Sequence, residues 1–326
     1  MGKNMKRKFL TLDEQLEYLK TVRNLSYDKE DITTLMREGY FNVITNYKTP
    51  FLIDPKNVES KFIDGTCLSN LIALKDFDDA IRILFLEYLV KIEQEVRALT
   101  SYLFDKFNNN GETSWEDLQS YNIEDIKITK INALINRIKN DMDNNDNNDI
   151  NSYLSRHEEI PTWAMIQGIS YSTYLIFIKD VKKEVQNELT KIYQLQNTYG
   201  IYIFDYFYKI IDLFRELRNK CAHNEKIFDF EFNDEHIDEI ISMELLRKGF
   251  KLPENIKLIN IIIYLKYFLD DIDYKIFINR LLKELKRLYD KINKKSFYTV
   301  LSDLGINSSE MLKIIKNVKI KKSYNF

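Results

Sequence analysis

The sequence has few residues that interrupt helices, with only 8 glycines and 4 prolines among 326 residues. Glycine and proline are the strongest local breakers of regular structure, so we expect long helices rather than many short strands. The sequence also contains no glycine-rich phosphate loop and no nucleophile elbow. Their absence argues against a P-loop nucleotide-binding protein and against an α/β-hydrolase.

Cysteine is scarce as well. The two cysteines, Cys67 and Cys221, are far apart in the chain and form no C-x-x-C pair. We therefore expect neither a disulfide framework nor a zinc site, and a reducing cytoplasm fits this composition. The basic start leads into a polar helix, and no apolar run is long enough to span a bilayer. We expect no signal peptide and no contact with membranes.

Composition is otherwise that of an ordinary soluble globular protein, with 44% hydrophobic and 30% charged residues. The length allows one large domain or two small ones. The net charge of −2 conceals an asymmetry, because residues 283–326 hold 11 Lys and Arg against 4 Asp and Glu. That segment carries +7 and the rest of the chain −9. Such a basic segment is either solvated surface or a docking site for phosphates.

The longest helical pattern covers residues 69–107 and has one unbroken apolar stripe. We expect most of the charges on its other face to be solvated or paired; they are Asp78, Arg82, Glu93, Glu95 and Arg97. Other helices are expected after a capping box at Thr11, and near 28–39, 40–47, 124–139, 163–178, 180–195, 201–223, 236–247, 256–269, 273–294 and 308–317.

Two stretches do not fit a helix. The Asn/Asp-rich tract at 140–151 has nothing to bury and lacks the glycine and closing glutamate of a calcium-binding EF-hand loop, so we interpret it as a mobile surface insertion. Phe228, Phe230 and Phe232 alternate with acidic residues, which indicates a brief extended segment at most.

The helix at 201–223 ends in the sequence RNKCAH. With about 100° of rotation per residue, Arg218 lies at the edge of the apolar stripe, while Asn219 and His223 share a flank turned away from it. These polar residues thus stand beside a core stripe without belonging to it. The alternative is structural: a surface Arg-Asn pair, and a histidine that stabilises the negative end of the helix dipole.

The RNKCAH sequence resembles the R-x(4–6)-H motif of HEPN-domain ribonucleases. Several stretches, in order, are similar to abortive-infection proteins of the AbiF/AbiD (Abi-like) type. They are FLTLDEQLEYLK, GYFNVITNYKTPF, FIDGT followed by KDFDDAIRILFLEYLVKIEQEVR, then PTW and LRNKCAHNEKIFDF. This resemblance covers about residues 9–230, and the C-terminal third matches only in its helical character.

The resemblance implies an all-α protein with a HEPN-like helical bundle. We divide it into an N-terminal helical region at 1–66, a HEPN-like core at 67–230 that contains the insertion, and a C-terminal helical region at 231–326 with the basic tail. The implied activity is metal-independent RNA cleavage in antiviral defence, as a toxin, without a cofactor. Arg218, Asn219 and His223 are the positions that match the catalytic motif. A structured noncoding RNA that inhibits the toxin is an implied partner.

RNA can be cut without a metal because its 2′-hydroxyl is a built-in nucleophile. A histidine titrates near neutral pH and serves as base or acid, and an arginine fits phosphate oxygens. Arg218 and His223 are separated by roughly 140° on an ideal helix, so one chain does not easily bring both to one phosphate. We therefore expect a homodimer with a composite site.

RNA rather than DNA is the expected nucleic acid. The residues expected to bind it outside the catalytic set are Arg215, Lys220, Lys313, Lys316, Lys319, Lys321 and Lys322. Arg215 has an alternative role as an ion-pair partner of Asp212 or Glu216. Cys221 falls on the apolar stripe, which favours packing over a nucleophilic role. One alternative to the toxin remains, a non-catalytic RNA-binding or scaffolding protein. Silencing of the HEPN domain by nucleotidylation near its motif is a further possibility, which would add regulation to the toxin rather than replace it.

Overall fold

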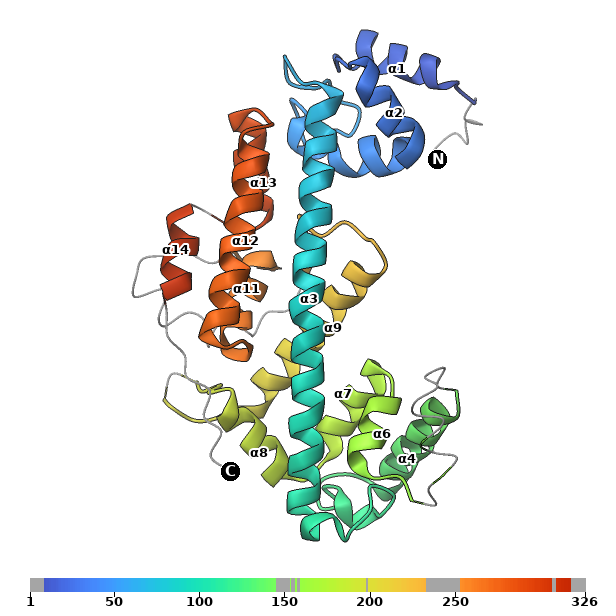
Figure 1. Ribbon diagram of the computed structural model, residues 1–326, viewed down its shortest axis with the longest axis vertical. Helices are drawn as coiled ribbons and strands as arrows, with labels where there is room; N and C mark the ends of the chain where they lie inside the picture. The colour runs from blue at the N-terminus through green and yellow to red at the C-terminus, as the bar shows by residue number, and fades with distance from the viewer. Residues whose placement is uncertain are drawn as a thin grey trace.

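One long helix organises the protein. In the computed structural model, which describes residues 9–144, 153, 156, 159–197, 199–232, 253–306 and 309–317, α3 spans Leu68–Phe107. Its 40 residues give a length of about 60 Å. The other elements are arranged along it from end to end, and several of the later helices pack directly against it (Figure 1). The expected all-α architecture is confirmed, and the expected helix at 69–107 is confirmed to within one residue.

The N-terminal elements surround the first turns of α3 (Figure 1). They are α1 (Leu12–Thr21), α2 (Lys29–Glu38), the π-helical turn η1 (Phe41–Thr45) and the 3-10 turn η2 (Thr49–Phe51). The capping box at Thr11 is present, since its hydroxyl accepts from the Glu14 amide and the Glu14 carboxylate accepts from the Thr11 amide. Gly39 ends α2 with a φ of 83°, which glycine adopts readily.

A second group of helices packs against the C-terminal half of α3 (Figure 1). After the 3-10 turns η3 (Asn109–Gly111) and η4 (Leu118–Ser120), it comprises α4 (Ile128–Asp143), α6 (Thr162–Gly168), α7 (Tyr171–Asp180) and α8 (Lys183–Ile192). The helix α4 extends into the Asn/Asp-rich tract and buries Met142 in its last turn. Residues 145–151, the remainder of that tract, lie outside the described part of the chain.

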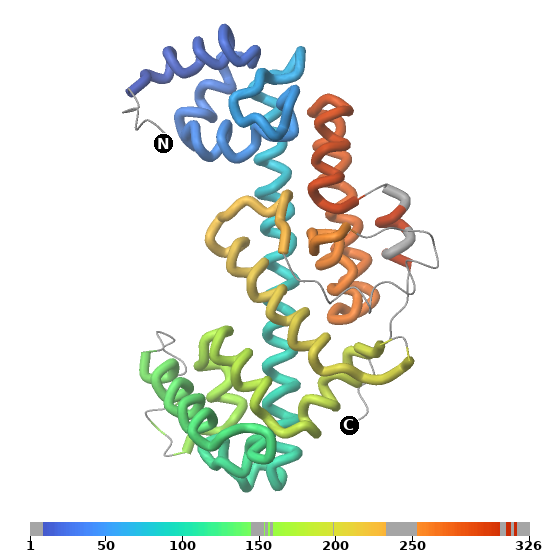
Figure 2. Tube along the Cα trace, turned by 180° about the vertical axis from the view of Figure 1, so that it is seen from behind, coloured from blue at the N-terminus to red at the C-terminus, as the bar shows by residue number. Residues whose placement is uncertain are grey.

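The helix that carries RNKCAH is α9 (Phe204–Ala222), which crosses α3 obliquely (Figure 2). Its buried stripe packs on α3 and contacts α7, α8 and α11.

The C-terminal elements lie alongside α3, and α12 (Asp271–Tyr289) packs directly against it (Figure 1). A two-residue strand β1 (Glu231–Phe232) pairs antiparallel with β2 (Ile256–Lys257). The brief extended segment is thus confirmed only at its end, since Phe228 and Asp229 form a turn. Then follow α11 (Leu258–Phe268), α12, α13 (Lys294–Asp303) and α14 (Ser309–Asn317). The expected helix at 273–294 ends earlier, at Tyr289, because Asn293 caps a separate helix, α13, by accepting from the Ser296 amide. The expected helix at 236–247 lies outside the described residues.

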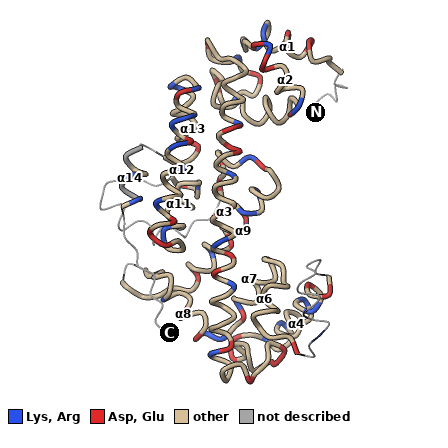
Figure 3. The backbone as a smooth tube through the Cα atoms, in the orientation of Figure 1, with Lys and Arg blue, Asp and Glu red and all other residues tan. Residues whose placement is uncertain are grey.

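Charged residues of both signs line α3 and α12 (Figure 3). Arg280 on α12 pairs with Glu87 on α3 at 2.7 Å, and Lys91 on α3 pairs with Asp273 on α12. These are exposed pairs, so each contributes well under about 1 kcal/mol to stability. Within the part of the chain that the structure describes, no helix is both long and apolar enough to cross a membrane.

The buried carboxylate of Asp78 joins α3 to two other segments. Its Oδ1 accepts hydrogen bonds from the backbone amides of Phe228 at 2.7 Å and Ile227 at 3.1 Å, just after α9. Its Oδ2 accepts from the hydroxyl of Tyr47 in the N-terminal region at 2.9 Å. Asp78 has no exposed surface, so these donors replace water.

Arg82, one turn further along α3, supports the same loop. Its guanidinium donates to Asp78 and to the carbonyl oxygen of Glu225, each at 3.2 Å. From within the loop, Lys226 donates to the carbonyl oxygen of Asn46 in the N-terminal region at 3.2 Å. The loop at 225–228 therefore makes hydrogen bonds to α3 and to the N-terminal region. These charges are paired, as expected, but Asp78 and Arg82 are buried rather than solvated.

This arrangement predicts a measurable dependence of stability on pH. Burial raises the pKa of Asp78 to about 6 from its ordinary value of 3.8, against the lowering effect of Tyr47, the two amides and Arg82. A carboxyl with a raised pKa stabilises the fold below its unfolded pKa and loses that contribution as the pH rises through the folded pKa. The wild-type protein should thus lose about 3 kcal/mol relative to Asp78→Asn between pH 4 and pH 7.

Urea unfolding of both proteins at several pH values measures this difference. Asp303, whose pKa burial also raises to about 6, is common to both proteins, so the comparison isolates Asp78. Free energies of unfolding that run parallel across this pH range would contradict the assignment.

Candidate active site

The motif lies at the C-terminal end of α9. Phe214, Leu217 and Cys221 are buried and fix the helix against the core. The helix ends at Ala222, and His223 is its C-cap, with its amide donating to the carbonyl oxygen of Asn219 at 2.9 Å. Asn224 then reverses the chain with a φ of 62°, a conformation that asparagine tolerates better than most residues.

Arg218 faces α3. Its Nε lies 3.5 Å from Oε2 of Glu93, which is an ion pair but too long for a hydrogen bond. Its Nη1 donates to the side-chain oxygen of Asn219 at 3.1 Å. About a third of the Arg218 side chain is exposed (34%), while the Nε atom itself is buried without a hydrogen bond. The guanidinium is thus held along one side and reaches solvent on another.

His223 is exposed, and its ring makes no hydrogen bond or ion pair to any residue that the structure describes. The side chain of Asn219 bonds to Arg218 rather than to His223. The structure therefore brings Arg218 and Asn219 into contact but does not join either side chain to the imidazole. A single chain presents the three motif residues as two separate groups.

Of the basic residues expected to bind RNA, four lie in the described part of the chain, and three of these are engaged in contacts within it. Arg215 pairs with Asp212 at 2.6 Å, which was the alternative role for this residue. Lys220 pairs with Glu225 at 3.0 Å. On α14, Lys313 is exposed and Lys316 donates to Asn279 at 2.7 Å. Lys319, Lys321 and Lys322 lie outside the described residues.

Sequence reasoning did not assign a role to the residues that surround Arg218. Glu93 on α3 binds Arg97 as well as Arg218, and Arg97 is only 5% exposed. Burial raises the pKa of the adjacent Tyr171, with a further contribution from the Glu93 carboxylate. The signal available in the sequence was the i,i+4 spacing of Glu93 and Arg97, which favours an ion pair. That spacing does not indicate which residue of another helix packs against the pair.

A pocket opens beside the motif on the other flank of α9. Its lining residues come from α3 and from the end of α9: Asp79, Arg82, Ile83, Leu86, Cys221 and Asn224. Ile83 is 64% exposed there, a large apolar side chain next to the motif.

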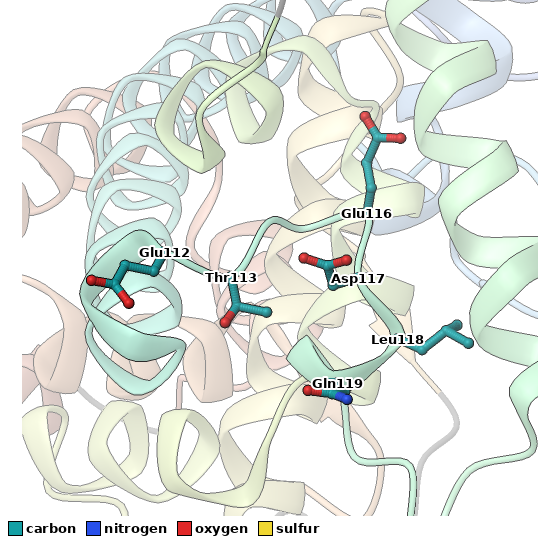
Figure 4. A pocket seen from close by; sticks show the side chains of 6 residues that line it. All are labelled: Glu112, Thr113, Glu116, Asp117, Leu118 and Gln119. Carbon is teal, nitrogen blue, oxygen red and sulfur yellow. The ribbon is translucent and has the colours of Figure 1, made fainter.

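Two acidic clusters in the described part of the chain have side chains of the kind that bind metal ions. Glu112, Glu116 and Asp117 line an open pocket beyond α3, but the carboxylates of Glu112 and Glu116 point away from one another, and Glu116 pairs with Lys139 (Figure 4). They do not converge on a point where an ion could bind.

The second group consists of Asp28, Asp31 and Cys67, whose ligand atoms lie within 4.8 Å of one another. The Oδ2 atom of Asp31 already accepts hydrogen bonds from the Asp28 amide at 3.2 Å and from the Cys67 thiol at 3.7 Å. These contacts cap α2 and link it to the start of α3, so a structural role accounts for them.

Cys221 provides a test of the motif's chemistry. Burial raises the pKa of its thiol to about 12, so the reactive thiolate is almost absent at neutral pH. Iodoacetamide at pH 8 should alkylate the partly exposed Cys67 of the folded protein and leave Cys221 unmodified, as mass spectrometry of the peptides will show. Both should react after denaturation. Rapid alkylation of Cys221 in the folded protein would restore it as a candidate nucleophile.

Comparison with known proteins places these elements in a family. A family model described as Abi-like protein matches residues 33–229, which include α3, α9 and the loop that Asp78 holds. No curated protein and no solved structure gives a match. The matched residues make up more than half of the chain. The chain therefore belongs to the Abi-like protein family, and this membership suggests a role in abortive infection.

Proposed function

We propose that the protein is a metal-independent endoribonuclease of the HEPN type that acts as a toxin in abortive infection, with Arg218, Asn219 and His223 as catalytic residues. The observation that carries the proposal is the arrangement at the end of α9. One side of the Arg218 guanidinium is held by Glu93 and Asn219, and the His223 ring is exposed beyond the last turn. Membership of the Abi-like family supports the setting in defence.

The chemistry follows from the side chains. The 2′-oxygen of RNA attacks the adjacent phosphorus, and the bond from phosphorus to the 5′-oxygen breaks. A base takes the proton of the 2′-hydroxyl, and an acid gives a proton to the departing 5′-oxygen. His223 is suited to either task, while Arg218 stabilises the extra negative charge on the phosphate oxygens. The products end in a 2′,3′-cyclic phosphate and a 5′-hydroxyl.

A single chain does not complete this site. The Arg218 and His223 side chains are not in contact, so we propose a two-fold homodimer in which the ends of two α9 helices face each other. The exposed Ile83, beside Cys221 and Asn224, supports this arrangement, since a second copy would cover an apolar side chain there. A structured small RNA that restrains the toxin completes the proposal, in line with the sequence resemblance.

Removal of the imidazole tests catalysis directly. His223→Ala should lower RNA cleavage by about 1,000-fold, because it removes the general base or acid. Thermal stability should hardly change, since the ring is exposed and leaves no cavity. His236→Ala, at a histidine with no assigned role, is the matched control and should cleave normally.

The same assay identifies the mechanism. A substrate with 2′-deoxyribose at the scissile position should resist cleavage, and chelators should have no effect. The mechanism would be contradicted if the deoxyribose substrate were cleaved as fast as the all-RNA substrate, or if a chelator stopped cleavage of RNA. RNA binding without any cleavage by the wild-type protein would instead support the non-catalytic alternative.

The composite site makes a separate prediction about assembly. Light scattering should find a homodimer, and Arg218→Ala and His223→Ala should each be inactive alone. When the two variants are mixed and allowed to exchange subunits, part of the activity should return, because the mixed dimer holds one arginine and one histidine at the site. A stable monomer that cuts RNA would rule out this arrangement.

A further inference from the structure

Glu93 on α3 is shared by two arginines. Its Oε1 accepts hydrogen bonds from Nε and Nη2 of Arg97, at 3.1 and 2.9 Å. Its Oε2 faces Nε of Arg218 at 3.5 Å. The Glu93 side chain is only 12% exposed, so the carboxylate lies between the two helices rather than in solvent. Each oxygen of the carboxylate therefore serves a different arginine.

Arg97 keeps that carboxylate in place. Its Nη1 donates to the carbonyl oxygens of Ile166 and Ile169, at the end of α6. Its guanidinium also lies over the rings of Tyr171 and Tyr174, with centroid distances of 5.6 and 5.0 Å. The edges of the Arg97 guanidinium therefore donate to Glu93 and to two backbone carbonyl oxygens, and two tyrosine rings lie against it. A carboxylate paired with such a rigid partner has little freedom to follow a moving Arg218.

The contacts of Arg218 leave part of its guanidinium available. Nε faces Glu93 and Nη1 donates to Asn219, while Nη2 has no hydrogen bond to any described residue. A guanidinium is planar, so holding the Nε side also sets the direction of the remaining N–H groups. The cluster of Glu93, Arg97 and Arg218 carries a net charge of +1 rather than +2.

We propose that Glu93 is a positioning residue that aims the guanidinium of Arg218 at the scissile phosphate, an inference that rests on the proposed ribonuclease function. It acts through Arg218 and does not touch the substrate. The Glu93 carboxylate also neutralises one of the two positive charges of Arg97 and Arg218, which limits how tightly the cluster binds a phosphate in the ground state. Orientation, rather than phosphate affinity, is what Glu93 contributes.

Two substitutions separate this role from a structural one. Glu93→Asp shortens the side chain by one carbon–carbon bond of about 1.5 Å. Aspartate can still pair with Arg97, one turn away on the same helix, but it no longer reaches Arg218 on α9. Glu93→Gln keeps the length and removes the charge. The matched control is Glu87→Gln, also on α3, which breaks the exposed ion pair with Arg280 on α12.

The cleavage assay should show a split between kcat and KM. Glu93→Asp should lower kcat by about 100-fold while its thermal midpoint stays near that of the wild type, because a small misplacement of a catalytic group has this effect. Glu93→Gln should lower kcat similarly with an equal or lower KM, because the cluster gains one positive charge. The control should match the wild type. Wild-type kcat in both Glu93 variants would overturn the proposal.

A second measurement does not depend on cleavage. Phenylglyoxal modifies the guanidinium of arginine, and an ion pair with a carboxylate holds that group and slows its modification. Modification of Arg218, followed by mass spectrometry of its peptide, should be about threefold faster in both Glu93 variants than in the wild type. An unchanged rate would overturn the proposal even if the wild type cuts no RNA. A faster rate without cleavage by the wild type would uphold the contact and reject the ribonuclease function.

Discussion

The carboxylate of Asp78 lies in the interior of the protein and joins three parts of the chain. It accepts from a tyrosine of the N-terminal region and from two backbone amides just beyond α9, while its own helix is the long axis of the fold. A buried carboxylate is costly unless its lone pairs are occupied, and here each oxygen has donors. The end of α9, and with it the position of His223, depends on this set of hydrogen bonds.

The helix α3 thus supports the motif at two levels. Asp78 and Arg82 determine where the chain goes after His223, and Glu93, about three turns beyond Arg82 on α3, faces Arg218. One rigid helix thereby contacts both Arg218 and the loop that follows His223. Because a helix advances by only 1.5 Å per residue, residues spaced along α3 can meet successive turns of α9 as it crosses. The motif residues on α9 would not hold these positions in an isolated helix.

Much of the fold could be predicted from the sequence. The stripe of α3, the capping box at Thr11 and the small number of glycines and prolines indicated a long-helix protein, and the structure confirms it. The predicted ends of helices were less accurate where a capping residue interrupts a stretch whose apolar spacing continues. Asn293 ends one helix and begins another inside a stretch whose apolar spacing continues, so α13 was not separated from α12. Met142 extended α4 into a polar tract because one buried side chain is enough to fix a last turn.

For the site, the sequence by itself contained the RNKCAH motif, through its resemblance to the HEPN pattern, and helical spacing placed Cys221 in the core. It did not determine which charges are buried. Asp78, Arg82 and Arg97 look like a solvated face in the sequence, yet each is at most 6% exposed, because loops and helices distant in sequence cover them. Only the tertiary structure placed Glu93 between Arg97 and Arg218. The physical reason is that periodicity gives the direction of a side chain on its own helix, whereas its partner depends on how two helices cross.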